Sequence, residues 1–256
     1  MITADSPATR IPVLLYHSVT DDPADSIAPY SVTPSAFARH MEAVAKEHHV
    51  LSISQLAGCL AGDAPLPRAP VVVTFDDGFA DNLTVAGPQL AARSIPATVY
   101  VTTGYLGRAG MLELRSLIDL EALGIEIGAH AHSHTPMDEL PLDRAREEIR
   151  RSKAVLEDAL GHGLASFAYP HGYSTAAVRE EVRAAGFGSA CGVKNAFSHL
   201  ADDVWCIARL TVRSETSVEQ LERWLAGEGA PVAWSDETLQ TRAWRAARRV
   251  KRVVAP

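Results

Sequence analysis

Two adjacent carboxylates, Asp76 and Asp77, follow the apolar run 71–75 and precede Gly78. Neighbouring carboxylates repel each other, and a bound cation offsets that cost. Because successive residues leaving a strand point in different directions, one carboxylate could hold a metal while its neighbour faces a bound water. A turn after a strand also often carries Asp, so the spacing alone leaves a site and a turn as equal interpretations.

Three histidines follow a second apolar run, residues 125–128, at alternate positions: His130, His132 and His134. Neutral imidazole binds zinc and the neighbouring divalent metals. If the chain turns helically there, His130 and His134 share a face, and if it stays extended all three do. The spacing leaves both geometries open, but this clustering of three of the 10 histidines indicates a metal site.

The elements that must position these residues alternate along the chain. Short apolar runs predict strands at 11–16, 70–75, 97–101, 125–128, 166–169 and 207–212. Apolar residues recurring at three and four predict helices at 37–47, 82–93, 112–123, 143–160, 176–185 and 218–225. This alternation predicts an α/β fold with parallel strands, either a barrel or an open doubly wound sheet. Both architectures bind ligands at the carboxyl ends of the strands.

Composition excludes several classes of protein. The 256 residues are 47% apolar and 21% charged, which suits one soluble domain with a large core. The net charge of -7 argues against a nucleic-acid binder, so no nucleic-acid partner is expected. The wide spacing of Cys59, Cys191 and Cys206 predicts buried thiols in a reducing compartment.

The two ends of the chain carry further expectations. Residues 1–10 lack a basic stretch followed by an apolar core, and no apolar run could span a bilayer, so a cytoplasmic location is expected. Residues 1–226 are predicted to form the catalytic domain and 227–256 a basic amphipathic tail. The tail's basic residues are Arg242, Arg245, Arg248, Arg249, Lys251 and Arg252. It could dock an anionic membrane surface or a partner, or pack its apolar side on the barrel.

Taken together, these segments resemble the polysaccharide deacetylases, carbohydrate esterase family 4. Residues 74–78 look like the first motif of that family, residues 130–134 like the second, and residues 167–172 like the third. The resemblance runs from about Leu14 to Val212, which is most of the chain. It implies a deformed (β/α)7-type barrel in a single domain.

The resemblance also implies roles for the motif residues. Asp77, His130 and His134 would hold a divalent metal, expected to be Zn2+, with Co2+, Ni2+ or Mn2+ as alternatives. Asp76 would be the general base that takes a proton from a water. The metal would acidify that water and polarise the amide carbonyl. A backbone N–H near His171 would help hold the oxyanion.

An amine leaving group must be protonated, so a general acid is needed as well. Many members of the family use a histidine in a late Leu-x-His motif, and none follows Val212. His17, which ends the first predicted strand, instead resembles the N-terminal histidine of the poly-N-acetylglucosamine deacetylases, whose layout is the most similar. His17 is therefore the expected acid, with a core histidine bonded to backbone as the alternative.

The third motif departs from the family pattern. It often carries an Arg that orients the base, and Ala168 holds that position here. Arg209, on the last predicted strand, could supply the missing guanidinium or form an ordinary surface pair. Tyr169, Pro170, His171 and Arg209 are expected to bind substrate.

The remaining histidines carry simpler expectations. His132 could support a ligand, contact the substrate or be solvated. Five others are expected at the surface: His40, His48, His49, His162 and His199.

The predicted function is metal-dependent removal of N-acetyl groups from GlcNAc-type saccharides or sugar conjugates. Aromatic residues are only 6% of the chain, so a short or lipid-linked substrate fits better than a long glycan. The alternatives are a deformylase or an O-acetyl esterase on the same fold, or a catalytically silent saccharide-binding module.

Overall fold

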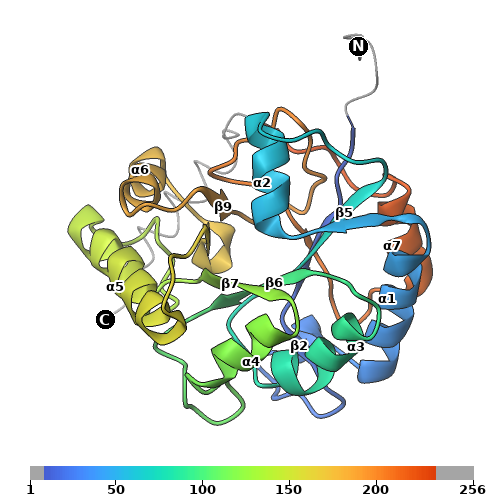
Figure 1. The fold of residues 1–256 in the computed structure, drawn as a ribbon, viewed down its shortest axis with the longest axis horizontal. Coiled ribbons are helices and arrows are strands. Elements are labelled where there is room, and N and C mark those ends of the chain that lie inside the picture. Colours follow the sequence, from blue (N-terminus) through green and yellow to red (C-terminus); the bar gives the residue numbers. More distant parts are fainter. Residues whose placement is uncertain (1–8, 235–256) are drawn as a thin grey trace.

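The computed structural model describes residues 9–234, which form a curled parallel sheet surrounded by helices (Figure 1). The main strands lie in the order β10-β1-β5-β6-β7-β8-β9. β4 pairs with the first half of β5, and β6 pairs with its last two residues. Their bounds are β1 Val13–Tyr16, β4 His49–Leu51, β5 Pro70–Phe75, β6 Ala97–Val101, β7 Ile125–Ala129, β8 Ser166–Ala168, β9 Ser189–Cys191 and β10 Leu210–Thr211. Two short strands, β2 Ser18–Val19 and β3 Ser31–Val32, pair separately. This is the expected deformed barrel in a single domain.

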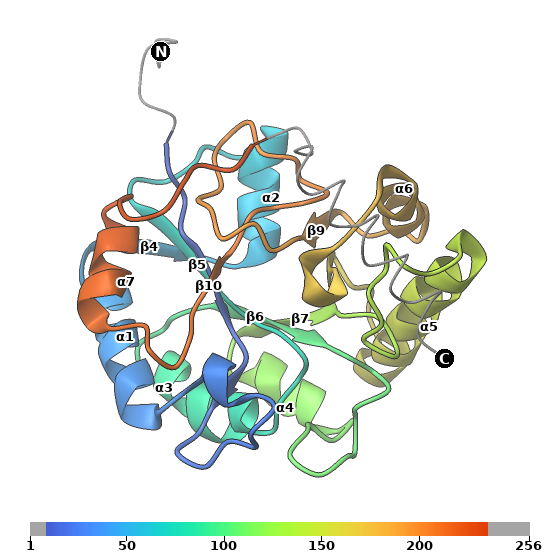
Figure 2. The same ribbon diagram turned by 180° about the vertical axis from the view of Figure 1, so that it is seen from behind.

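The segment from Ile207 to Thr211 joins the two edges of the curled sheet. Ile207 forms a parallel bridge with Cys191 of β9, and Leu210 pairs with Leu14 of β1. The strand predicted at 207–212 is therefore split, because the segment changes partners between its two ends. Figure 2 shows the chain running from β9 to β10 across this side of the molecule.

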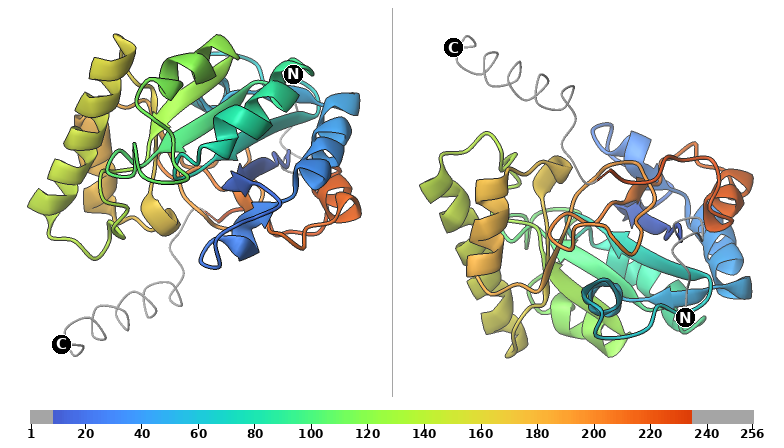
Figure 3. Two further views of the ribbon diagram at one scale, coloured as in Figure 1. Left: turned by 90° about the horizontal axis from the view of Figure 1, so that it is seen from below. Right: turned by 90° about the horizontal axis from the view of Figure 1, so that it is seen from above.

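Helices cover the outside of the sheet. They are α1 Pro34–Glu47, α2 Ile53–Ala61, α3 Gly87–Ala91, α4 Ser116–Ala122, α5 Leu142–Leu160, α6 Ala176–Ala184 and α7 Val218–Leu225, with short turns η1 Ala28–Tyr30, η2 Asn82–Ala86 and η3 Pro170–Gly172. α5 packs beside α6 at one end of the molecule, and α1 packs beside α7 at the other (Figure 3). The sequence prediction missed α2, although a capping box formed by Ser52 and Gln55 begins it.

The core confirms the buried strands and corrects one histidine. Every residue of β5 is buried, as parallel strands covered on both faces should be. The three cysteines are buried free thiols, as expected. His40 is fully buried on α1, so its predicted surface position is wrong. Its ring nitrogens lie 3.1 Å from the Tyr16 hydroxyl and 3.2 Å from the Thr216 carbonyl, which ties α1 to β1 and to the segment before α7.

The chain stays attached to the barrel beyond α7. The backbone N–H of Phe197 donates to the Pro231 carbonyl, and the N–H of Ala233 donates to the Phe197 carbonyl. The predicted basic tail lies outside the described residues from position 235 onward.

Across residues 9–234, no helix is both long enough and apolar enough to cross a lipid bilayer.

Candidate active site

The carboxyl ends of β1, β5 and β7 open into one cavity of about 620 Å³. Its wall includes all five side chains predicted to do chemistry or bind metal: His17, Asp76, Asp77, His130 and His134. The edge of a parallel sheet brings together residues that are far apart in sequence.

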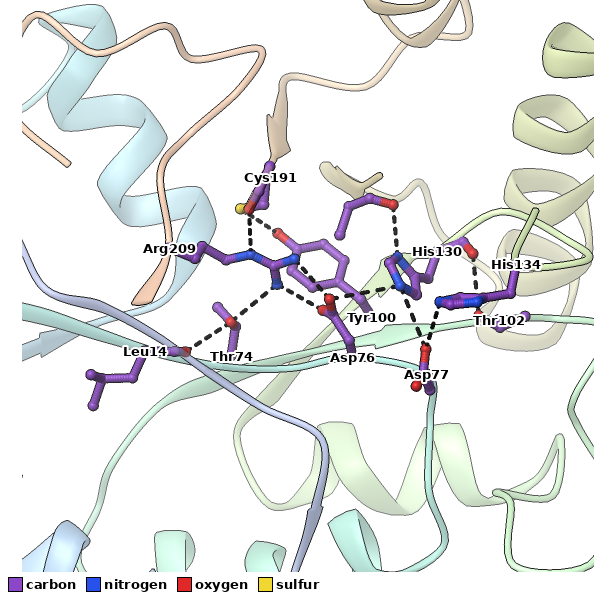
Figure 4. A network of polar contacts seen from close by, with 12 residues as sticks. Leu14, Thr74, Asp76, Asp77, Tyr100, Thr102, His130, His134, Cys191 and Arg209 are labelled. Atoms are coloured by element: carbon purple, nitrogen blue, oxygen red, sulfur yellow. Dashed lines mark hydrogen bonds and ion pairs between the residues drawn. The ribbon is translucent and has the colours of Figure 1, made fainter. Parts of the chain in front are cut away.

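A sharp turn after β5 sends the two adjacent carboxylates in different directions (Figure 4). Asp77 has a φ of 74° and Gly78 a φ of 85°, so two successive residues adopt left-handed backbone. This conformation is uncommon for a residue with a side chain and is often found at functional sites. The turn leaves Asp76 facing Arg209 and Asp77 facing His130 and His134.

Asp77, His130 and His134 form a set that fits a metal ion. Nε2 of His134 lies 3.1 Å from Oδ1 of Asp77, and Nε2 of His130 lies 3.6 Å from the same oxygen. The three possible ligand atoms lie within 4.8 Å of one another. Oδ1 of Asp77 is buried and accepts no well-aligned hydrogen bond from residues 9–234. A buried carboxylate oxygen facing two imidazole nitrogens is the arrangement that a divalent cation would stabilise.

His130 is held in the tautomer that metal binding requires. Its Nδ1 lies 2.8 Å from the Ala168 carbonyl, so Nδ1 carries the proton and Nε2 presents its lone pair to Asp77. Burial lowers the pKa of His130 to about 4, against the opposing effect of the Asp76 and Asp77 charges. The ring is therefore neutral at physiological pH.

The turn that carries His134 is neither helical nor extended. Ala131 and His134 have φ values of 60° and 61°. The carboxylate of Glu148, on α5, accepts hydrogen bonds from the backbone N–H groups of His132 at 2.9 Å and Ser133 at 2.6 Å. The His132 ring lies 2.8 Å from the Thr103 hydroxyl and is not part of the ligand set, so His132 supports the turn.

Replacing Glu148 with glutamine should weaken metal binding by about tenfold, because the His134 turn would lose a charged acceptor shared by two N–H groups. Competition with a chromophoric chelator measures this affinity directly. Glu147→Gln is the matched control, because Glu147 is exposed and pairs with Arg144 on the outer face of the same helix. Equal affinities for the two variants would refute the supporting role of Glu148.

Arg209 lies buried behind Asp76 and forms a bidentate pair with it. Nη1 and Nη2 donate to Oδ1 and Oδ2 of Asp76, both at 2.7 Å, and Nε donates to the Gly192 carbonyl at 2.9 Å. Burial alone would raise the pKa of Asp76, but the charge of Arg209 and its hydrogen bonds outweigh this effect and lower the pKa. Asp76 is therefore a fixed, ionised carboxylate. The surface-pair interpretation is wrong, because the Arg209 side chain is fully buried. Arg209 does not line the cavity, and its expected substrate contact stays a prediction.

Ala168 explains how Arg209 reaches this position. Ala168 belongs to the buried cluster that includes Tyr100 and Cys191, and the Arg209 guanidinium stacks 5.5 Å from the centre of the Tyr100 ring. Because Ala168 on β8 is small, it leaves interior space for the Arg209 side chain, which comes from the segment before β10. The guanidinium that the third motif lacks thus comes from the segment just before β10.

His17 lies in the wall of the cavity, with its ring 5.2 Å from the centre of the Tyr30 ring. Its buried Nδ1 has no hydrogen-bond partner among the described residues, which argues against a core histidine bonded to backbone. Burial lowers the pKa of His17, while the Asp76 and Asp77 charges act in the opposite direction. Once protonated, His17 is therefore a stronger acid than an exposed histidine.

The third motif contributes less to the cavity than its sequence predicts. Tyr169 is fully buried and donates its hydroxyl to the Trp205 carbonyl at 3.0 Å, and Pro170 is also buried. Neither lines the cavity, and their expected substrate contacts stay predictions. His171 does line it, with a φ of 57° and its ring 4.6 Å from the His134 ring.

Several cavity residues have no signal in the sequence: Tyr30, Tyr105, Tyr173, Asn195 and Arg213. They lie on loops beyond the strand ends, where neither periodicity nor motif spacing identifies them.

Comparison with known proteins agrees with this fold. The family model described as polysaccharide deacetylase matches residues 63–190. YxkH of Bacillus subtilis strain 168, named as a candidate polysaccharide deacetylase, is 25% identical over 172 residues, which cover 67% of this chain and 60% of YxkH. The match thus spans less than two thirds of that relative.

Two solved structures are similar over 84% of this chain and 97% of their own. Deacetylase PplD of Streptococcus pyogenes, solved with acetate, has a TM-score of 0.77 and 22% identity. IcaB of Ammonifex degensii has a TM-score of 0.75 and 26% identity. The family model covers half of the chain, from the loop between α2 and β5 into β9, and includes both carboxylates and the histidine pair. The chain belongs to the polysaccharide deacetylase family.

Proposed function

We propose that this protein is a metal-dependent hydrolase that removes N-acetyl groups from GlcNAc-type saccharides or sugar conjugates. One observation carries the proposal: an ionised carboxylate fixed by a buried guanidinium faces the same cavity as a carboxylate and two imidazoles able to hold a cation. Asp76 is thereby kept free to accept a proton while Asp77 is available as a ligand. A protein that only binds saccharides would not need the general base Asp76 beside a set of metal ligands.

The donor set of Asp77, His130 and His134 suits zinc, with cobalt, nickel or manganese as alternatives. When bound, such a cation would acidify a water and polarise the acetamide carbonyl. Asp76 would take the proton from that water, and Arg209 would hold the carboxylate in place during the transfer. His17 would give a proton to the nitrogen of the amino sugar as the C–N bond breaks.

The cavity supports a short substrate. Its volume of about 620 Å³ is that of a small-molecule site, and Tyr30, Tyr105 and Tyr173 offer three separate rings in its wall. The apolar side chains of Leu15 and Phe79 also line it and suit a small acyl methyl group. The cytoplasmic location and the membrane contact of the tail stay predictions.

The proposal is tested by acetate release from short GlcNAc oligomers and GlcNAc conjugates, using metal-loaded enzyme, chelated enzyme and chelated enzyme with metal restored. We expect release that disappears on chelation and returns with metal. N-formyl and O-acetyl analogues run in parallel, with formate measured for the first and acetate for the second. Faster hydrolysis of the formyl analogue would favour a deformylase, and faster hydrolysis of the O-acetyl analogue would favour an esterase. Saccharide binding without any release would favour the silent module.

A further inference from the structure

The charge of the cavity wall is uneven. Asp76 and Asp77 are the only carboxylates among the described residues that line the cavity. Asp76 pairs with Arg209, and Asp77 belongs to the candidate metal set. Arg213 also lines the cavity and brings a permanent positive charge to a different part of the wall. The catalytic roles proposed above do not use this charge.

Arg213 is held in place by its backbone and by an aromatic ring. The N–H of Val212 donates to the Leu15 carbonyl at 2.8 Å, and the N–H of Arg213 donates to the Thr216 hydroxyl at 2.9 Å. The guanidinium stacks 4.8 Å from the centre of the Tyr30 ring. Stacking on a ring leaves the N–H groups at the edge of the guanidinium able to donate.

No carboxylate in residues 9–234 forms an ion pair with Arg213. The nearest acidic residue in sequence, Glu215, accepts a hydrogen bond from the Ser214 hydroxyl at 3.1 Å instead. A guanidinium in a cavity wall without an acidic partner is suited to a ligand that brings the negative charge itself.

The position of Arg213 relative to the base sets where that charge would lie. Arg213 is four residues beyond Arg209, about 13 Å along an extended chain. Thr211 lies between them and also lines the cavity, as does Asn195, whose Oδ1 accepts the Thr211 N–H at 3.2 Å. This bond leaves the Asn195 amide N–H groups as further donors. Arg213 and Asp76 line the same cavity, so an anion at Arg213 would belong to the same ligand as the scissile amide.

We propose that Arg213, stacked on Tyr30, is the anchor of an anion subsite, and that the substrate is an N-acetylated amino sugar with a phosphate ester or a carboxylate close to the acetamido group. This inference rests on the proposed deacetylase function and narrows its substrate class. The guanidinium pairs with either anion through two parallel N–H bonds. The same charge repels an already deacetylated, cationic neighbouring sugar, which disfavours processive action on a glucosamine-rich polymer.

The test is acetate release by metal-loaded wild type from methyl N-acetylglucosaminide, GlcNAc 1-phosphate and GlcNAc linked to glucuronate. We expect kcat/KM for at least one anionic substrate to exceed that for the neutral one by about tenfold. Arg213→Gln should reduce this ratio to near one, and Arg213→Lys should retain part of it. Whether kcat/KM rises for GlcNAc 1-phosphate or for GlcNAc linked to glucuronate identifies which anion Arg213 binds.

Arg108→Gln is the matched control. Arg108 stacks 4.9 Å from the centre of the Tyr105 ring, as Arg213 stacks on Tyr30, but it does not line the cavity. This variant should keep the wild-type ratio. Equal preference for neutral and anionic substrates in wild type, or an unchanged ratio in Arg213→Gln, would overturn the subsite. If the metal alone held the phosphate, the ratio would be unchanged in Arg213→Gln.

Failure of the deacetylase function is distinguished by a binding measurement. If none of the three substrates releases acetate, the proposed function fails, and calorimetry with glucosamine 1-phosphate then tests the subsite by itself. Affinity for metal-loaded wild type that falls about tenfold in Arg213→Gln, and not in Arg108→Gln, would support the anion subsite. Equal affinity in all three proteins would overturn it.

Discussion

Replacing Arg209 with methionine should lower kcat by about a thousandfold while leaving metal content unchanged. The guanidinium fixes both oxygens of Asp76 and keeps this buried carboxylate ionised. Without it, burial would raise the pKa of Asp76, and the base would be protonated over much of the useful pH range. The acid limb of the pH profile of kcat should therefore move to higher pH. Acetate release between pH 4 and pH 9, beside bound-metal analysis, measures both effects on protein first shown to be folded.

Arg179→Met is the matched control for Arg209→Met. Arg179 also pairs with a carboxylate, donating to Asp203 at 2.7 Å, but neither residue lines the cavity. It should leave the acid limb in place. The double variant Arg209→Ala with Ala168→Arg should recover part of kcat, because the small β8 residue faces the same buried cluster. A pH profile that does not move in Arg209→Met would contradict the positioning role.

Replacing His17 with glutamine should lower amide hydrolysis by about a thousandfold and hydrolysis of an activated acetate ester by about tenfold or less. The amine must gain a proton as it leaves, whereas a nitrophenolate leaves without one. His17 lies in the cavity wall, and its Nδ1 has no hydrogen-bond partner in the described part of the chain. Comparing release from a GlcNAc oligomer and from p-nitrophenyl acetate with the same enzyme preparation measures the difference.

His162→Gln is the control for this substitution, since His162 is exposed and pairs with Glu121 far from the cavity. It should affect neither substrate. Equal losses of amide and ester hydrolysis in His17→Gln would show that His17 shapes the cavity rather than donating a proton.

Much of the site could be predicted because the metal-binding and acid–base residues lie in short motifs directly after strands. The adjacent pair Asp76 and Asp77, and the spacing of His130 and His134, already placed a carboxylate and two imidazoles at one edge of a parallel sheet. The strands themselves were visible because they are buried on both faces and therefore continuously apolar. The central strands lie where the sequence predicts them, within about two residues.

The rest depends on contacts between distant segments. The sequence could not show that Ala131 and His134 adopt left-handed backbone, because Glu148 on α5 holds that turn. Tyr169 and His40 are buried for a related reason: each has a polar group whose partner, Trp205 or Tyr16, comes from another element. Arg209 did carry a signal. A charged residue within an apolar strand must find a buried partner, and Asp76 was the nearest candidate of opposite charge in a motif.

The most direct test of the central claim is to measure bound metal and acetate release together in wild type, Asp76→Asn and Asp77→Asn. Asparagine tolerates the left-handed backbone at position 77, so that turn should survive. We predict that Asp76→Asn keeps the metal and loses turnover, whereas Asp77→Asn loses both. Turnover that persists in Asp76→Asn, or metal that remains as tightly bound in Asp77→Asn as in wild type, would contradict the division of roles between the two carboxylates.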